Sequence, residues 1–329
     1  MSEVVLVIPN WNGESHLRRL FPSLASQTRR PGRILVVDNG STDGSIAYVL
    51  EQGGEVLVLP HNLGFAAAVN RGISSTSERL VAILNNDVVL EPRYLEILED
   101  SLERGAAFAT GKIYQPGRNN VLDATWDLVT RSGLPVRCGH GVQDGTFWNE
   151  AREIALAPLT AALFHRWVFD RVGNLDERFE SYLEDVDFGL RCAVSGLKGR
   201  YVPEARAEHI GSGTLGVWHA ATVRRISRNQ VYLVAKHFPS EWALIVGWPF
   251  VAGQLLWGLA AARHGRAAAW LAGKLAGVWN YRAMRASVES LTPGEPLLPL
   301  LDRFERELIE IQMKTGTDRF WSWYFRWTR

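Results

Sequence analysis

Residues 4–45 read VVLVIPNWNGESHLRRLFPSLASQTRRPGRILVVDNGSTDGS, and this stretch decides the fold class. It opens with an apolar, mainly β-branched run at residues 4–9, which is short enough for a strand buried on both faces. The next apolar residues recur at helical spacing, at Leu17, Leu20, Phe21 and Leu24. A second apolar run at residues 34–37 ends at Asp38. The order strand, helix, strand predicts two parallel strands joined by a helical crossover.

The same alternation continues to residue 84. We expect strands at residues 56–59 and 80–84, with a helix at residues 65–73 between them. This order predicts an α/β fold with a doubly wound, mostly parallel sheet flanked by helices. Ligands of such sheets bind beyond the carboxyl ends of the strands. Polar clusters follow three of those ends here, at residues 9–12, 38–43 and 85–87.

Composition narrows the class of protein. The chain has 329 residues, 47% of them apolar, which is room for one large α/β domain and a smaller appendage. A formal net charge of +1 and the lack of a long basic run argue against a nucleic-acid partner. Two cysteines, Cys138 and Cys192, suit a reducing compartment rather than a disulfide framework. The N-terminus lacks the basic and long apolar parts of a signal peptide, so we interpret it as the first strand.

Three pairs of motifs occur in order between residues 4 and 235: VVLVIPNWNGESHL with ILVVDNGSTDGS, HNLGFAAAVNRGI with LVAILNNDVVLEP, and VGNLDERFESYLEDVDFGLRC with YVPEARAEHIGSGT. In this order and spacing they resemble the family 2 glycosyltransferases of the GT-A fold, and within them the rhamnosyltransferase-like branch. The resemblance implies an inverting hexosyltransferase that takes a sugar from a nucleotide-diphosphate donor. One departure is that Asn86-Asp87 stands where much of the GT-A fold carries two aspartates.

Recognition of the donor nucleotide centres on Asp38. At a strand end its carboxylate can accept a hydrogen bond from the N3–H of uracil or thymine. The resemblance implies this same role, with Pro9 and Asn10 lining the base and ribose. The alternative is a plain β-turn at residues 38–40. The other candidate donor-binding residues are Asn12, Asn39, Asn62, Gly64 and Asn86.

The diphosphate of the donor requires compensating charge. Asn62 and Gly64 precede a predicted helix, where backbone N–H groups can contact phosphate, although an ordinary helix start also explains these residues. A divalent cation, Mg²⁺ or Mn²⁺, offsets charge on the leaving group, and Asp87 is its expected carboxylate ligand. The resemblance implies His209 as a second metal ligand; the alternative is an ordinary hydrogen-bonded loop histidine.

Inverting transfer needs a base that takes the proton of the acceptor hydroxyl. Residues 184–187, EDVD, crowd three carboxylates into four positions, and like charge with partial burial raises the pKa of a carboxylate. The resemblance implies Asp185 as the catalytic base, and we expect Glu184 and Asp187 to position the acceptor. The alternative is an acidic helix start, in which Arg191 pairs with Asp187 one turn away.

The chain changes character near residue 238. We therefore expect a catalytic domain at residues 1–237, with a nucleotide-sugar half at about 1–110 and an acceptor half at about 111–237. Residues 238–329 form a second, helical region that is rich in Trp and Arg. Residues 242–262 have about the length of a membrane span, but Pro249 lies within them and basic residues follow. We expect peripheral association with the inner face of the cell membrane. A helical hairpin that packs on the domain or in a homo-oligomer is the alternative.

These observations predict a cytoplasmic glycosyltransferase of cell-wall or polysaccharide biosynthesis. The expected donor is a dTDP- or UDP-linked sugar, with rhamnose as one candidate. The expected acceptor is a hydroxyl of a lipid-linked or polysaccharide molecule. One alternative is a nucleotidyltransferase, which would leave the carboxylates at residues 184–187 unused. Another is a nucleotide-binding, membrane-associated scaffold without catalysis, which the asparagine in the metal motif favours. The sequence leaves the sugar, the acceptor and the linkage open.

Overall fold

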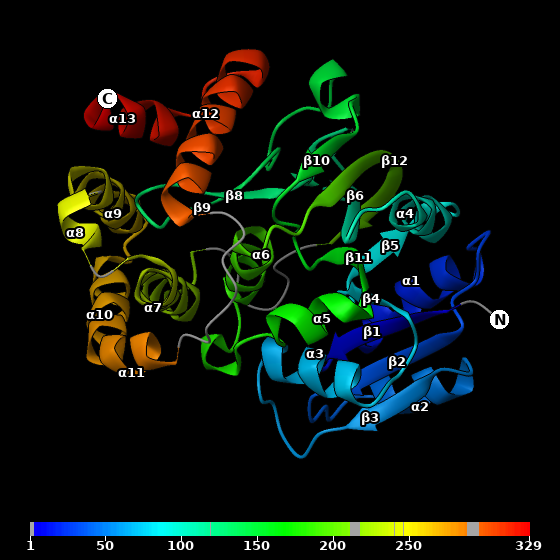
Figure 1. Ribbon diagram of the computed structural model, residues 1–329. Helices are drawn as coiled ribbons and strands as arrows, with labels where there is room; N and C mark the ends of the chain where they lie inside the picture. Colours follow the sequence, from blue (N-terminus) through cyan, green and yellow to red (C-terminus); the bar gives the residue numbers. More distant parts are fainter. Residues whose placement is uncertain (1–2, 119, 211–217, 240, 246, 288–295) are drawn as a thin grey trace. The chain divides into compact units, whose positions relative to one another are not determined.

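The computed structural model describes residues 3–118, 120–210, 218–239, 241–245, 247–287 and 296–329. The chain divides into two compact units. The first, here called the sheet unit, comprises Met1–Asp127, Arg137–Ala193 and Leu197–Gly211. The second, here called the helical unit, comprises Leu128–Val136, Val194–Gly196 and Ser212–Arg329. Figure 1 shows the strands of the first unit in blue to green and the helices of the second in yellow to red.

Four parallel strands begin the sheet unit. They are β1 (Val4–Asn10), β2 (Arg33–Asp38), β3 (Glu55–Val58) and β4 (Leu80–Leu84), in the spatial order β3-β2-β1-β4. The helices between them are α1 (Glu14–Ala25), α2 (Ser45–Glu51) and α3 (Phe65–Ser74). All four expected strands, and the two helices expected after the first and third of them, are confirmed.

Helices cover both faces of these strands, so every residue of β1 except the half-buried Pro9 is buried. Leu6 and Ile8 join a core with Leu20 and other apolar residues of α1. Val7 points to the opposite face, where a Cβ atom added at Gly72 of α3 would lie 2.4 Å from its side chain. Two-sided burial explains why the β1 sequence is a continuous apolar run rather than an alternating one.

The rest of the sheet is mixed, and the expectation of a mostly parallel sheet is wrong there. Strand β11 (Ala161–His165) lies between β4 and β6 (Phe108–Tyr114) and runs antiparallel to both. Strand β12 (Gly199–His209) is parallel to β6. The physical reason is the connection from β6 to β11, whose described residues form short strands and a 3₁₀ turn. A crossover helix, which parallel neighbours ordinarily require, does not stand between them there.

Short elements complete this part of the sheet unit. Strands β5 (Val88–Leu90) and β10 (Arg152–Ile154) pair antiparallel with β12, and β7 (Leu122–Ala124) pairs with β6. The 3₁₀ turns are η1 (Thr146–Asn149) and η2 (Glu177–Phe179). The remaining helices are α4 (Tyr94–Glu103), α5 (Arg166–Val172) and α6 (Glu184–Val194). Strands β8 (Asp127–Val129) and β9 (Pro135–Arg137) form a separate hairpin.

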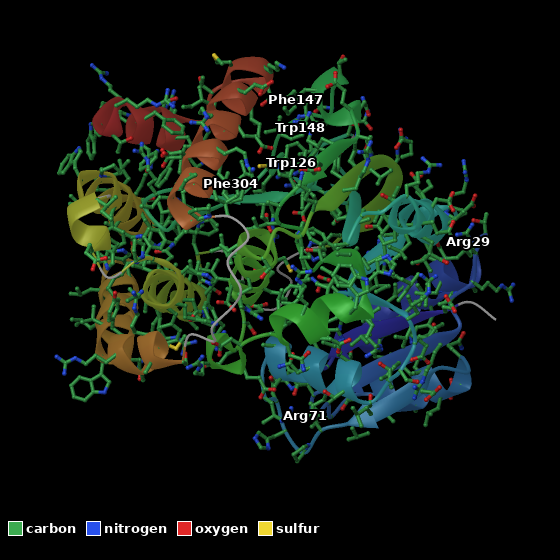
Figure 2. The ribbon with its side chains drawn as sticks, viewed as in Figure 1. Arg29, Arg71, Trp126, Phe147, Trp148 and Phe304 are labelled. Carbon is green, nitrogen blue, oxygen red and sulfur yellow. The ribbon has the colours of Figure 1, made fainter. Side chains whose placement is uncertain are left out.

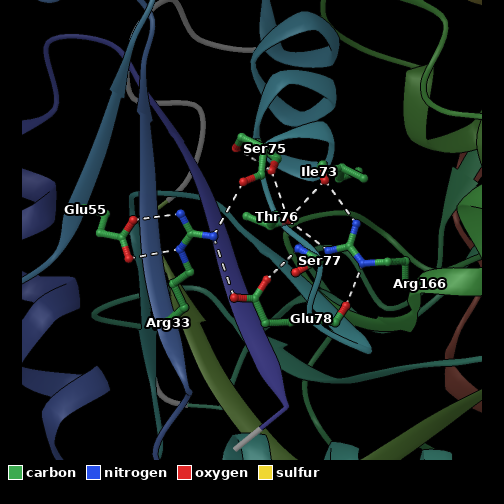
Figure 3. Close-up of polar contacts among 9 residues, drawn as sticks. Arg33, Glu55, Ile73, Ser75, Thr76, Ser77, Glu78 and Arg166 are labelled. Atoms are coloured by element: carbon green, nitrogen blue, oxygen red, sulfur yellow. Dashed lines mark hydrogen bonds and ion pairs between the residues drawn. The ribbon is translucent and has the colours of Figure 1, made fainter.

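Arginine side chains form hydrogen bonds along the amino edge of the sheet (Figure 3). Arg33, at the start of β2, donates two hydrogen bonds to Glu55 of β3, at 2.9 and 2.7 Å. Arg166 of α5 donates to the carbonyl oxygens of Ile73 and Glu78, at 3.0 and 2.6 Å. These contacts tie the end of α3 to the sheet. They leave the opposite, carboxyl edge for the site.

The helical unit contains seven helices among its described residues: α7 (Ala220–His237), α8 (Trp242–Ile245), α9 (Gly247–Arg263), α10 (Ala267–Trp279), α11 (Tyr281–Ala286), α12 (Leu297–Thr315) and α13 (Arg319–Thr328). Pro249 lies in the first turn of α9, where its missing N–H would have no helical partner, so it does not break this helix. Within the described ranges, no helix has both the length and the apolar character needed to cross a membrane.

A buried ionic contact joins two parts of the helical unit that are distant in sequence. Arg131, between β8 and β9, donates from its backbone N–H and from Nε to the carboxylate of Glu305 in α12, at 2.9 and 2.8 Å. Tyr324 of α13 donates its hydroxyl to the same carboxylate at 2.6 Å. Phe304, labelled in Figure 2, is buried beside Glu305 in α12.

Candidate functional site

Three strand ends meet at the carboxyl edge of the sheet, and their polar side chains bond to one another. Asn10, the last residue of β1, donates from Nδ2 to Oδ1 of Asp38 at 3.1 Å. Its own Oδ1 accepts from Nδ2 of Asn86, which follows β4, at 2.7 Å. Pro9 precedes Asn10 in β1 and is half-buried. The structure therefore brings together the candidate residues that the sequence places after β1, β2 and β4.

Asp38 is buried and its carboxylate is already oriented. Its Oδ2 accepts from the backbone N–H of Ser41 at 2.9 Å, and its Oδ1 accepts from Asn10. Each carboxylate oxygen has two lone pairs, so one further acceptor position on each oxygen is left for a ligand N–H. Asn12 is exposed and adopts a left-handed conformation with φ of 48°, and its Oδ1 accepts from the N–H of Thr42 at 2.8 Å.

Asn39 holds the loop that carries Asn62 and Gly64. Its Nδ2 donates to Oδ1 of Asn62 at 3.2 Å and to the carbonyl oxygen of Gly64 at 3.0 Å. Gly64 has φ of 91°, and a Cβ atom there would lie 2.8 Å from the carbonyl oxygen of Glu180. Glycine is required here by the close approach of the segment before α6, as well as by the backbone conformation.

His209 lies between the carboxylate of Asp87 and a second carboxylate. Its Nε2 lies 3.2 Å from Oδ1 of Asp87, and its Nδ1 lies 2.8 Å from Oδ2 of Asp123 in β7. The backbone carbonyl oxygen of Asp123 lies 3.0 Å from Nδ1 of His140. The two expected metal ligands are thus neighbours, and Asp123 contacts the other nitrogen of the His209 ring.

This network shifts the pKa values of its members. Burial alone would lower the pKa of His209, but hydrogen bonds to Asp123 and Asp87 raise it to about 9. Burial alone would raise the pKa of Asp87, yet the hydrogen bond and charge of His209 hold it below its usual value. The pKa of Asp123 is lowered against its burial by hydrogen bonds from His140 and His209.

The pair fits part of a divalent-cation site. A carboxylate oxygen and an imidazole nitrogen face each other, and the other imidazole nitrogen bonds a carboxylate, which is the usual arrangement behind a metal-binding histidine. Among the residues that the structure describes, no group of three or more His, Cys, Asp and Glu side chains could hold a metal ion. The protein therefore offers a partial ligand set of the kind that Mg²⁺ and Mn²⁺ complete with phosphate oxygens and water.

Asp185 lies in the first turn of α6 with 14% of its side chain exposed. Burial raises its pKa, while the charge of Arg137 lowers it, with Nη2 of Arg137 at 3.6 Å from Oδ2. Asp127 shares the same guanidinium, at 3.7 Å from Nε, and burial raises its pKa to about 7. Two carboxylates thus share the guanidinium of Arg137, and Asp185 is the more accessible of the two.

Glu184 and Asp187 are buried, on the inner side of α6. Oδ2 of Asp187 accepts from Nε and Nη2 of Arg191, at 3.2 and 3.1 Å. Arg191 also donates to the carbonyl oxygens of Gly173 and Asn174, at 3.1 and 2.8 Å. These contacts fix the segment after α5 to α6, and the structure does not bring Asp187 to the accessible side on which Asp185 lies.

The backbone before α6 is strained. Glu180, Tyr182 and Leu183 have φ values of 63°, 70° and 68°, a left-handed region that side-chain-bearing residues rarely adopt. Such strain persists only where surrounding contacts hold it, and it occurs often beside functional residues. Here it lies directly before Asp185 and beside Gly64, so it sets the direction in which α6 begins.

Residues 5–146 match the family model described as glycosyl transferase family 2. The chain is a glycosyltransferase, with its family 2 match over those residues. It is 28% identical over 280 residues to the N-acetylglucosaminyl-diphospho-decaprenol L-rhamnosyltransferase of Mycobacterium tuberculosis, which covers 75% of this chain and 89% of the relative. It is also 28% identical over 218 residues to the O-antigen biosynthesis protein RfbC of Myxococcus xanthus, covering 63% of this chain and 17% of that protein.

Among solved structures, the glycosyltransferase is similar to a crystal structure of GalNAc-T7 with UDP, GalNAc and Mn²⁺, with a TM-score of 0.63. The two are 14% identical, and the match covers 95% of this chain and 57% of the other. At this identity the likeness supports the mixed α/β, GT-A-like fold and nothing finer. The family match favours sugar transfer over the nucleotidyltransferase and scaffold alternatives.

Sequence reasoning missed four ionisable residues of the glycosyltransferase: Asp123, Asp127, Arg137 and His140. They come from a stretch without helical or strand periodicity, where spacing gives no signal. Trp126 lies between Asp123 and Asp127 in the chain, is buried, and has its ring centroid 5.5 Å from that of Trp148 and 6.4 Å from that of Phe147. Figure 2 shows these three rings gathered together. The last part of the third motif, residues 211–214, lies outside the described residues.

Proposed function

We propose that this glycosyltransferase moves a rhamnosyl residue from a dTDP- or UDP-linked donor, with inversion, to a hydroxyl of a lipid-linked or polysaccharide acceptor. The rhamnosyltransferase of M. tuberculosis supports the sugar and the lipid-linked acceptor through its name and its 89% coverage. The observation that carries the proposal is that three candidate groups lie in the same compact unit. The sheet unit holds an oriented, buried Asp38, the Asp87–His209 pair and the half-buried carboxylate of Asp185.

The donor nucleotide lies at the carboxyl edge of the parallel strands. Asp38 accepts a hydrogen bond from N3–H of the pyrimidine, and Asn10, bonded to both Asp38 and Asn86, fixes the angle of that carboxylate. Pro9, Asn12, Asn39, Asn62 and Gly64 shape the surrounding loops. We expect a pyrimidine donor rather than a guanosine donor at this carboxylate.

Asp87 and His209 would hold a divalent cation, which would supply positive charge to offset the negative charge of the departing diphosphate. The carboxylate of Asp123 orients the histidine ring, with its Oδ2 2.8 Å from Nδ1, so that Nε2 faces Asp87. Mg²⁺ and Mn²⁺ would both suit an oxygen and a nitrogen ligand completed by phosphate.

Asp185 acts as the general base. Its carboxylate takes the proton of the acceptor hydroxyl while the hydroxyl oxygen forms a bond to the anomeric carbon from the face opposite the diphosphate. The bond from that carbon to the diphosphate oxygen breaks, and the nucleoside diphosphate leaves with its electron pair. One proton moves to Asp185 and the configuration inverts. Asp187 supports the acceptor side through its pair with Arg191, which fixes α6 to the segment after α5, and Glu184 lies on the same buried side of α6.

The acceptor's lipid requires the enzyme to work at a membrane, so we place it peripherally on the inner face of the cell membrane. The Trp- and Arg-rich helical unit supports this location. A homo-oligomer formed through the same unit is the competing arrangement.

Product analysis tests the proposed function. Purified full-length protein is incubated with a panel of nucleotide sugars, a short-chain polyprenyl-diphosphate-linked acceptor and Mn²⁺, and products are analysed by mass spectrometry and by NMR of the new anomeric proton. We expect transfer of a deoxyhexose from the dTDP- or UDP-linked donor with inverted configuration. Transfer with retained configuration, or from a guanosine-linked donor alone, contradicts the proposal.

A further inference from the structure

The helical unit carries an exposed apolar stripe on each of two adjacent helices. On α9 the large exposed side chains recur at intervals of three and four residues: Trp248, Val251, Leu255 and Leu259. On α10 they recur in the same way: Leu271, Leu275 and Val278, followed by Trp279, which is 89% exposed. At this spacing each set lies along one side of its helix.

The stripe of α9 points away from α7. Trp257 lies on the opposite side of α9 and donates its indole N–H to the hydroxyl of Ser227 in α7, at 3.1 Å. Gly258 faces α10, because a Cβ atom there would lie 2.9 Å from the ring of Trp270. Helices α9 and α10 are therefore neighbours, and the stripe of α9 lies on the side opposite Trp257.

The stripe of α10 also lies on the side away from α7. Gly273 and Gly277 form the opposite side of α10 and approach α7 closely. Added Cβ atoms would lie 2.2 Å from the carbonyl oxygen of Arg224 and 2.6 Å from Cβ of Val231. Leu271, Leu275 and Val278 consequently lie on the outer side of α10. The two stripes together form one surface, which we call the outer face of α9 and α10.

Tryptophans of α13 continue this surface. Trp248 donates its indole N–H to the carbonyl oxygen of Trp327 at 2.5 Å, and Trp323 is exposed one turn before Trp327. The guanidinium of Arg326 lies 5.5 Å from the ring centroid of Trp323. Tryptophan beside arginine at the margin of an apolar face is typical of protein segments that lie at the headgroup level of a bilayer.

The positive charge near this surface favours an anionic bilayer over a second copy of the chain as its partner. Residues 242–287 contain five Lys and Arg residues and no Asp or Glu. Arg263 and His264 at the end of α9 and Arg282 in α11 are exposed. A second copy of this chain, related by a twofold axis, would bring the same cations together with no acid among these residues to pair them. A negatively charged bilayer offers both an apolar interior for the stripes and phosphates for the cations.

We propose that the outer face of α9 and α10 docks in the plane of a bilayer that contains anionic phospholipid. The stripes enter the boundary between headgroups and acyl chains, and Arg263, Arg282 and Arg326 contact lipid phosphates. This inference rests on the proposed function for the inner-membrane location, and it adds the surface and the lipid class.

Co-sedimentation of the full-length protein with vesicles tests this surface. Vesicles contain either phosphatidylglycerol with phosphatidylcholine, or phosphatidylcholine alone. We expect Leu259→Glu to lower the partition coefficient on the anionic vesicles several-fold, and a triple change of Leu255, Leu259 and Leu275 to Glu to lower it at least tenfold. Leu50→Glu in α2 is the matched control, because Leu50 and Leu259 are 58% and 60% exposed, and it should bind like the unaltered protein.

Three results would overturn the inference. The first is equal binding of the Leu259→Glu and unaltered proteins, and the second is equal binding to both kinds of vesicle at low salt. The third is the loss of a dimer by Leu259→Glu in sedimentation velocity without vesicles, which would assign the surface to a second copy. Hydrolysis of the donor sugar, measured on the same samples without vesicles, reports on the sheet unit. Its absence in the unaltered protein counts against the proposed function and leaves the vesicle result valid.

Discussion

Asp185 and the residues around its carboxylate are the most informative positions at the residue scale. In the proposed mechanism its partial exposure gives an acceptor hydroxyl access to it, and its Oδ2 lies 3.6 Å from Nη2 of Arg137. Neighbouring Asp187 has the opposite character, because it is fully buried and paired with Arg191. Three carboxylates in four positions therefore have different surroundings, which follow from the side of α6 on which each one lies.

We expect Asp185→Asn to lower kcat for sugar transfer by about 10²–10⁴-fold while donor affinity stays within about threefold, because an amide cannot accept the proton. Rate measurements with donor titration by calorimetry check both values. Asp170→Asn, on an exposed position of α5, is the control and should keep its activity. An Asp185→Asn enzyme with unaltered kcat would remove Asp185 from the role of base.

Arg137 provides a pH-dependent prediction. Its charge lowers the pKa of Asp185 against the effect of burial, so its removal allows that pKa to rise further. The base works only when deprotonated, so activity falls as the pH decreases through its pKa. We therefore expect Arg137→Gln to move the acidic limb of the kcat/KM profile to higher pH by about one unit.

The Arg137→Gln enzyme should recover activity at alkaline pH, which separates a changed pKa from a damaged fold. Arg118→Gln, on the exposed loop before β7, serves as the control and should leave the profile in place. An acidic limb that stays where it is, or that moves to lower pH, contradicts the assigned role of Arg137.

At the element scale, the packing of α10 on α7 depends on small residues. Gly273 and Gly277 leave no room for side chains between the two helices. This close contact directs the apolar side of α10 outwards. The sequence shows Gly at both positions but gives no partner for them.

We expect Gly277→Val to destabilise the helical unit by about 1–3 kcal/mol, because the added atoms overlap Val231. Thermal unfolding followed by circular dichroism measures the change. Ala272→Val, on an exposed position of the same helix, should change stability by no more than about 0.5 kcal/mol. Equal effects of the two substitutions would show that α10 does not pack on α7 as described.

At the scale of the whole molecule, ligand binding should stabilise the native state by mass action. We expect UDP or dTDP with Mn²⁺ to raise the melting temperature more than GDP does, with a gain of about 2.7 kcal/mol at a hundredfold excess over Kd. EDTA should abolish most of this gain, and Asp87→Ala should do the same, because one carboxylate supplies much of the protein's charge at the cation. Differential scanning fluorimetry provides the measurement.

An equal gain with all three nucleotides would contradict the role of Asp38 in base selection. An undiminished gain in EDTA would contradict the cation site and leave the nucleotide site intact. The two parts of the donor site are therefore tested separately by one series of samples.

The sequence by itself determined the parallel half of the sheet and the site residues at its carboxyl edge. Strands β1, β2 and β4 are buried on both faces, so their apolar runs are unbroken, and each run ends at a polar residue. Because parallel strands end at the same edge, the clustering of Asn10, Asp38 and Asn86 followed from local periodicity alone.

Only the tertiary structure decided the other half of the sheet and the neighbours of the proposed base. Strand β11 is antiparallel because of pairings between segments far apart in the chain, for which the sequence carries no local period. Asp123 lies 2.8 Å from His209 and Arg137 lies 3.6 Å from Asp185, although both pairs are far apart in the chain. Such contacts depend on which surfaces pack together, and periodicity reports only whether a side chain is buried, not what covers it.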